Sequence, residues 1–190
     1  EDSPPWVNAD SFKQSILGIS TPNVSAAAGS ACHEYVFSGK KEYTEAGFKF
    51  LVTDSLRECR ELFPFGAGVP EVAKVRYLDR KFCGYTVRIS QRIDYLLSNL
   101  VVEFKTSSKP FSGKGKTRSF LESMQSFSYT GTYGVPIQYV FAEIGIKKPG
   151  KESDIHICTL KSKSTYTAYP SAESNRRLEA CVESLIPYLQ

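Results

Sequence analysis

The N-terminal third of the chain carries apolar residues at helical spacing. One helix is predicted over residues 8–17 and a second over 25–39, where apolar and small residues recur every three to four positions. A third is predicted over 41–63, and Pro64 closes it because proline cannot continue a helix. We therefore expect a helical N-terminal part over residues 1–65.

From Val69 onward the period changes from helical spacing to alternation. The segment "VPEVAKVRYL" alternates apolar and polar residues, and the next segment is rich in β-branched and aromatic residues. Polar residues at 79–81 and 98–99 predict tight turns. We therefore expect an antiparallel meander of about three strands over residues 69–106.

The last third mixes both periods. A short helix is predicted over residues 118–130, strands over 135–146 and 154–162, and an amphipathic helix over 171–189. Helices, meander, helix, strands and helix follow one another without an internal repeat. The pattern predicts one α/β domain over the whole chain, with a mixed, twisted sheet flanked by helices and the core of that sheet in residues 66–190.

Composition narrows the class of protein. A chain of 190 residues is long enough for one substantial core, and a formal charge of +4 permits a nucleic-acid partner. No apolar run approaches the roughly 20 residues that span a bilayer. The five cysteines are scattered, odd in number and without a CxxC pair, which argues against a zinc ribbon or disulfide framework and for reduced thiols in an intracellular protein.

Two charges interrupt the apolar strand "LVVEFKT". Glu103 and Lys105 share one face because side chains alternate along a strand. A hairpin turning at residues 98–99 brings Asp94 beside them. Two carboxylates a few ångströms apart repel each other, and a divalent cation with a preference for oxygen ligands, Mg²⁺ or Mn²⁺, relieves that repulsion. The pattern predicts a metal site with a lysine beside it.

Glu-x-Lys alone is a weak signal, because a charged strand face is commonly just solvated. A second occurrence of the acidic-x-Lys pattern, Asp79-x-Lys81, is set aside because it falls in a predicted surface turn. Other residues strengthen the first occurrence. His33 lies on the predicted helix 25–39, and Gln125 and Tyr129 lie four apart, hence on one face of a helix.

In chain order these residues resemble the motifs of the PD-(D/E)xK nuclease superfamily, and in particular its RecB-type branch with its mitochondrial and phage exonucleases. "GSACHE" matches the Gly-x-x-x-His helix, "RID" the strand ending in Asp, "EFK" the (Asp/Glu)-x-Lys motif and "QSFSY" the Gln-x-x-x-Tyr helix. The resemblance covers most of the chain. It departs from the family at Gln91, where a glycine is usual, and the absence of a cysteine cluster excludes the iron–sulfur subset.

The resemblance implies a restriction-endonuclease-like core and a metal-dependent nuclease that hydrolyses phosphodiester bonds, with DNA as the favoured partner, single-stranded or attacked from an end. It also implies a role for each matching residue. Asp94 and Glu103 would bind Mg²⁺ or Mn²⁺ with the backbone carbonyl of Phe104 and His33, Lys105 would position the attacking water, and Gln125 and Tyr129 would brace the site or touch a phosphate.

A basic loop follows the proposed site residues. No acidic residue occurs between Lys105 and Leu121. Such a loop suits a phosphate backbone, with an aromatic ring available to stack on a base. Its candidate nucleic-acid-binding residues are Lys109, Phe111, Lys114, Lys116 and Arg118.

Several alternatives stay open at this point. A further carboxylate could join the metal site, with Glu71, Glu45 and Glu34 as candidates. The order His, Asp, Glu-x-Lys also resembles the cap-snatching RNA endonucleases of segmented negative-strand RNA viruses. A third possibility is a nucleic-acid-binding module that no longer cuts.

Overall fold

The structure is a computed structural model that describes residues 23–108 and 124–185. The helix expected over residues 8–17 lies outside the described residues. So do the five candidate residues of the basic loop, Lys109, Phe111, Lys114, Lys116 and Arg118.

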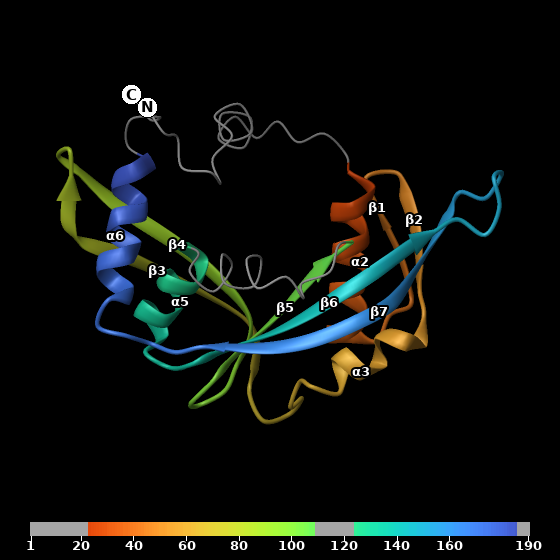
Figure 1. Ribbon diagram of the computed structural model, residues 1–190, viewed down its shortest axis with the longest axis horizontal. Helices are drawn as coiled ribbons and strands as arrows, with labels where there is room; N and C mark the ends of the chain where they lie inside the picture. The colour runs from red at the N-terminus through yellow and green to blue at the C-terminus, as the bar shows by residue number, and fades with distance from the viewer. Residues whose placement is uncertain (1–22, 109–123, 186–190) are drawn as a thin grey trace.

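Seven strands form one mixed, twisted sheet in the order β1-β2-β7-β6-β5-β4-β3 (Figure 1). Neighbouring strands are antiparallel except for the pairs β2–β7 and β5–β6. The predicted α/β class is confirmed. The strands are β1 (Glu42–Glu45), β2 (Phe48–Val52), β3 (Val69–Phe82), β4 (Tyr85–Leu96), β5 (Val101–Ser107), β6 (Ile137–Lys147) and β7 (Ile155–Ala168).

Helices cover both faces of the sheet. Helix α2 (Val24–Ser38) packs on one face through small and apolar residues, and Gly39 ends it with a φ of 80°. Helices α5 (Met124–Tyr133) and α6 (Ser174–Leu185) pack on the other face. The central strand β6 serves both cores, because its alternate residues point to opposite faces. Val140, Ala142 and Ile144 join the core under α2, and Ile137, Tyr139 and Phe141 join the core under α5.

The third predicted helix, over residues 41–63, is wrong. Its first half is the hairpin of β1 and β2, and only short turns of helix follow, η1 (Asp54–Leu56) and α3 (Arg57–Arg60). The hairpin turns at Ala46 and Gly47, with φ of 51° and 82°. Two consecutive residues with positive φ make the tight turn that matches the twist of paired strands. The helical N-terminal part expected over residues 1–65 therefore contains two strands of the sheet.

The predicted meander over residues 69–106 is confirmed, but one of its turns is misplaced. Residues 79–81 continue β3, and the chain reverses instead at Cys83 and Gly84, with φ of 47° and 83°. The surface turn that was the reason for setting aside Asp79-x-Lys81 does not exist there. The second turn is confirmed, since the Leu97 N–H donates to the Leu100 carbonyl at 2.8 Å.

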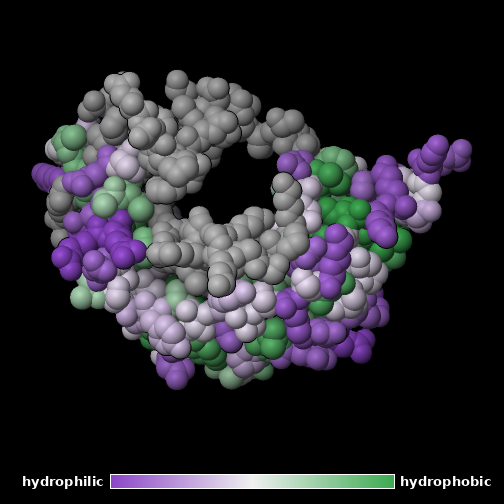
Figure 2. Space-filling view, viewed as in Figure 1, coloured by the Kyte–Doolittle hydropathy of each residue, from purple (hydrophilic) through white to green (hydrophobic). Residues whose placement is uncertain are grey.

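The C-terminal third follows the prediction with shifted boundaries. Helix α5 extends to Tyr133 rather than residue 130, and β7 runs to Ala168. The last helix begins at Ser174, because Ser171 and Ser174 form a turn in which the Ser174 N–H donates to the Ser171 carbonyl at 3.0 Å. Hydrophilic residues occupy the tip of the turn between β6 and β7 (Figure 2). None of the helices in the described part of the chain is long and apolar enough to cross a membrane.

The turn at Ala46 yields a stability prediction. An L-residue at positive φ is strained, and asparagine tolerates this conformation better than alanine. We expect Ala46→Asn to raise the free energy of unfolding by about 0.5–1 kcal/mol, as measured by urea denaturation. Ala73→Asn, at an exposed and extended position of β3, is the control and should not stabilise the protein. Equal effects of the two substitutions would contradict the turn assignment.

Candidate active site

The site begins where β4 and β5 separate. Only two residue pairs join the two strands, Tyr95 with Val102 and Leu96 with Val101. Beyond these two pairs, backbone amides donate hydrogen bonds to side-chain carboxylates instead of main-chain carbonyls. The Asp94 N–H donates to Glu103 Oε1 at 3.0 Å, and the Phe104 N–H donates to Asp94 Oδ2 at 2.7 Å. Each carboxylate is thus fixed by the main chain of the other strand, so the separation of the strands positions both groups.

Strand β4 also changes faces at Asp94. Ile93 belongs to the core under α5, whereas Tyr95 belongs to the core under α2. Residues two apart on a regular strand would share a face. The departure from regular alternation puts the Asp94 side chain between the two strands, where it is within reach of α2.

Helix α2 brings His33 to this carboxylate. His33 Nε2 lies 2.9 Å from Asp94 Oδ1, and its ring packs against Phe37 and Phe104. The close approach of the helix depends on Gly29. A Cβ on Gly29 would lie 2.9 Å from Thr106 Oγ1 at the end of β5, closer than atoms can pack without displacement. The glycine and histidine of "GSACH" thus have separate roles. Gly29 allows α2 to pack close to β5, and His33 contacts Asp94.

Glu103 and Lys105 form a buried ion pair. Glu103 is 0% exposed, and Lys105 Nζ lies 2.8 Å from its Oε2. At this distance the ammonium group is within hydrogen-bonding reach of the oxygen, and it partly compensates the buried negative charge. Burial, opposed by Lys105 and reinforced by the charge of Asp94, raises the pKa of Glu103 to about 7.

Helix α5 closes the site from the other face of the sheet. Gln125 Nε2 donates to the Tyr129 hydroxyl at 2.9 Å, and that hydroxyl donates to the Arg92 carbonyl at 2.7 Å. Burial, with the nearby charge of Glu103, raises the pKa of Tyr129 to about 12, so the phenol stays protonated. Because its hydroxyl is engaged by the protein, Tyr129 fits the bracing role better than contact with a phosphate.

An open cleft of about 600 Å³ borders the site. Residues of α2, β3, β4 and β5 line it, including His33, Asp94 and Lys105. Of the three further acidic candidates, Glu34 and Glu71 line the cleft, while Glu45 is not among its lining residues. Glu71 is engaged by Arg92, whose Nη2 lies 2.7 Å from Glu71 Oε1.

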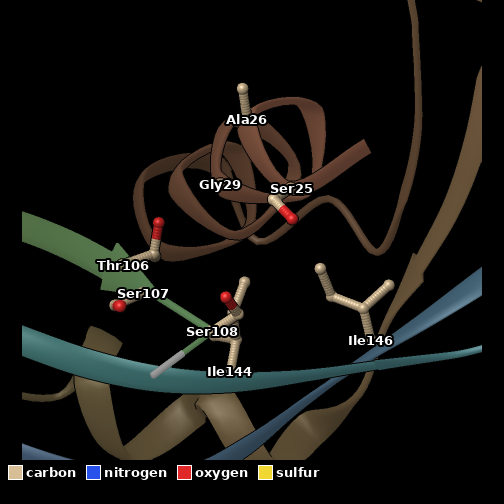
Figure 3. A pocket seen from close by; sticks show the side chains of 8 residues that line it. All are labelled: Ser25, Ala26, Gly29, Thr106, Ser107, Ser108, Ile144 and Ile146. Atoms are coloured by element: carbon tan, nitrogen blue, oxygen red, sulfur yellow. The ribbon is translucent and has the colours of Figure 1, made fainter. Parts of the chain in front are cut away.

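A second pocket of about 290 Å³ adjoins the cleft and shares Ala26, Gly29 and Thr106 with it. It lies between the first turn of α2 and the end of β5, with hydroxyl side chains on both sides and two isoleucines from β6 at its base (Figure 3). The cleft therefore continues past Lys105 along α2.

Sequence reasoning missed two residues of this region. Gln91, three residues before Asp94, is buried and donates through Nε2 to Ser128 and, at 3.0 Å, to Thr132 Oγ1, so it links β4 to α5. Its signal was a single polar residue in an otherwise apolar alternating series. Arg92 lines the cleft, and its signal was its place two residues before Asp94 on the same strand.

The donor set suits a hard divalent cation. Asp94 and Glu103 offer carboxylate oxygens, and the main-chain carbonyl of Phe104 is a further oxygen of the kind that such a cation binds. Over residues 23–108 and 124–185, no three His, Cys, Asp or Glu side chains are already grouped to hold a metal. In this arrangement His33 occupies Asp94 Oδ1, so cation binding there requires the imidazole to give up that hydrogen bond or to join as a ligand.

Comparisons with known proteins bear on the fold. No protein-family model matches the sequence, and no curated protein matches it either. The structure resembles the crystal structure of SSO0001, with a TM-score of 0.51 and 14% sequence identity over 94% of this chain and 67% of that chain. At this identity the likeness shows a shared fold alone.

The buried carboxyl group of Glu103 predicts an unusual pH dependence of stability in metal-free buffer. An unfolded chain releases this proton near the ordinary value of 4.5, and the folded protein holds it until about pH 7. Stability should therefore fall as pH rises through this window, by on the order of 3 kcal/mol from this group.

Urea denaturation in EDTA at pH 5 and pH 8 measures this effect. Glu103→Gln should remove most of the decline and make the metal-free protein more stable at pH 8. Glu173→Gln, at an exposed position in the turn before α6, is the control and should keep the wild-type slope. A Glu103→Gln variant with the wild-type slope would show that this carboxyl group is not the cause.

Gly29 gives a second prediction at the site. Gly29→Ala should lower the free energy of unfolding, because overpacking against Thr106 costs about 1–3 kcal/mol and exceeds the roughly 1 kcal/mol gain in helix propensity. In a Thr106→Ala background the same substitution should become neutral or stabilising. A double-mutant cycle by urea denaturation measures the coupling. Equal effects of Gly29→Ala in both backgrounds would contradict the close approach.

Proposed function

We propose that this protein is a metal-dependent nuclease that hydrolyses phosphodiester bonds. Within that class, we propose the RecB-type branch of the PD-(D/E)xK superfamily and DNA as the substrate. The observation that carries the proposal is the convergence of Asp94, Glu103 and Lys105 at the opening between β4 and β5, with His33 on Asp94 Oδ1 at 2.9 Å.

Each residue of the site has a task that follows from its contacts. Asp94 and Glu103, with the Phe104 carbonyl and His33, would hold Mg²⁺ or Mn²⁺. The cation would supply a Lewis acid that stabilises the negative charge developing on the phosphate. Lys105, an ammonium group that lines the cleft and touches Glu103, would orient the attacking water and balance charge.

Gln125 and Tyr129 would act as positioning residues rather than as ligands. Their hydrogen-bonded chain ends on the Arg92 carbonyl, two residues before Asp94. A hydrogen bond to this part of the main chain holds β4 where it parts from β5. Without these two hydrogen bonds Asp94 would be able to shift, and a shift of about 1 Å is enough to reduce the cleavage rate substantially.

We also propose an intracellular location. All five cysteines are free, and Cys32, Cys59 and Cys158 share the core under α2. A hydrogen bond with Cys158, together with burial, raises the pKa of the Cys32 thiol. Thiols that lie this close together would stay reduced most readily in a reducing compartment. These three cysteines, which are far apart in the sequence, thus lie together in one core. Their positions along the chain did not predict this.

A cleavage assay on end-labelled single- and double-stranded DNA and RNA, with Mg²⁺, Mn²⁺ or EDTA, tests the function. We expect DNA cleavage that needs a divalent cation. Lys105→Ala should lower the rate at least 100-fold and leave Mn²⁺ binding, measured by calorimetry, largely intact, whereas Asp94→Ala should lose both. Cleavage of RNA alone would favour the cap-snatching type of endonuclease. Binding without cleavage under every condition would favour an inactive binding module.

The chain offers a matched control pair for these substitutions. Lys49 and Asp154 form an exposed ion pair of 2.6 Å between β2 and the segment before β7, away from the cleft. Lys49→Ala and Asp154→Ala remove the same charges and should cut like wild type. If they lower the rate as much as the site variants do, the loss reflects net charge and the assignment of Asp94 and Lys105 fails.

A further inference from the structure

Within residues 23–108 and 124–185, no helix or strand packs on one face of the hairpin of β3 and β4. Alternate residues such as Val72 and Ile89 point toward α5 and α6 and pack in the cores there. Figure 1 shows these helices lying along the hairpin, at the end of the molecule away from α2. The residues of the other face are all exposed and form three cross-strand pairs. This open hairpin face consists of Ala73, Val75 and Tyr77 on β3 and their partners Arg92, Ser90 and Arg88 on β4.

The composition of the open hairpin face is unusual for a surface that meets only water. Val75 is 44% exposed and Tyr77 is 59% exposed. The exposed face of an antiparallel sheet normally carries polar residues. Here an apolar stripe on β3 lies beside a stripe of two arginines and a serine on β4. An aromatic ring next to arginine side chains is the combination that binds a nucleic-acid strand, with bases on the ring and phosphates on the guanidinium groups. Arg92 is already paired with Glu71 at 2.7 Å, so Arg88 is the candidate for the phosphate contact.

The open hairpin face is continuous with the cleft. Arg92 belongs to both, since it lines the cleft and pairs with Ala73. Asp94 follows it two residues later. Arg88 lies four residues before Arg92, which is roughly 13 Å along β4 toward the turn of the hairpin. A strand bound along β4 would therefore run from the exposed end of the hairpin directly to the carboxylates.

We propose that the open hairpin face binds single-stranded DNA and leads it to the cleft. This inference rests on the proposed nuclease function. A single strand is favoured because Tyr77 can stack only on bases that are not already paired. DNA is the nucleic acid because it is the substrate of the proposed nuclease, and Ser90 in the middle of the face offers a single hydroxyl group.

A second copy of the chain is the competing occupant, because β3 is an edge strand of the sheet. Edge strands are protected from pairing by charged side chains. On β3 these include Lys74, which lies over the ring of Tyr133, and Arg76. Like charges disfavour pairing of two copies edge to edge, and light scattering tests whether a second copy covers the open hairpin face itself.

Fluorescence anisotropy with a labelled DNA strand, in EDTA so that nothing is cut, measures binding. We expect Tyr77→Ala to weaken binding of single-stranded DNA about tenfold, as loss of a stacked base does. Arg88→Ala should reduce the salt slope by about 0.7, the value for one phosphate contact on a single strand. Tyr169→Ala and Arg176→Ala, exposed residues outside this face, are the matched controls and should bind like wild type.

The outcomes separate this inference from the proposed function. If wild type cuts DNA and the Tyr77 and Arg88 variants bind like the controls, the open hairpin face is not the binding surface, and the nuclease stands. If these variants lose binding but wild type cuts nothing, the surface stands and the nuclease fails. Tighter binding of duplex DNA or of RNA than of single-stranded DNA would overturn the choice of substrate. Dimers in light scattering that Tyr77→Ala dissolves would assign the face to a second copy.

Discussion

The parting of β4 and β5 depends on an exchange of hydrogen-bond partners between main chain and carboxylates. In a continuous sheet the amides of Asp94 and Phe104 would donate to carbonyls, but here they donate to Glu103 and Asp94. The exchange keeps both amides satisfied while the strands move apart. It also fixes two negative groups side by side, which the repulsion between them would otherwise prevent. The opening between the strands and the positions of the two carboxylates have this one origin.

Burial of Glu103 is the electrostatic consequence. A carboxylate without access to water is destabilised, and one ammonium group, Lys105, only partly offsets the loss, so the pKa rises to about 7. A second positive charge at the site would remove the remaining penalty. Under the proposed function, a bound cation would relieve this unfavourable state of the core. This is a physical reason for a buried acid in a strand that otherwise carries apolar residues.

The two faces of the sheet contribute different things to the opening. The core under α2 supplies His33, and it can do so because Gly29 lets the helix come close to Thr106. The core under α5 supplies Tyr129, whose hydroxyl holds the main chain at Arg92. A site at a gap in a sheet can be supported from both sides, whereas a site on one face cannot. The twist of β3 and β4 away from the rest of the sheet then leaves their outer face exposed beside the cleft.

The sequence pattern was sufficient to predict those elements whose structure depends on their own residues alone. The helix over residues 25–39, the meander and the pairing that brings Asp94 to Glu103 and Lys105 follow from periodicity and from a tight turn. Pattern failed over residues 41–63, because apolar spacing was ambiguous and the decisive signal was the positive φ of Ala46 and Gly47. The face change at Asp94, the approach of Gly29 to Thr106 and the clamp made by Gln91 were decided only by the tertiary structure. Each depends on which elements pack against each other, and burial between elements is not encoded in the spacing of either one alone.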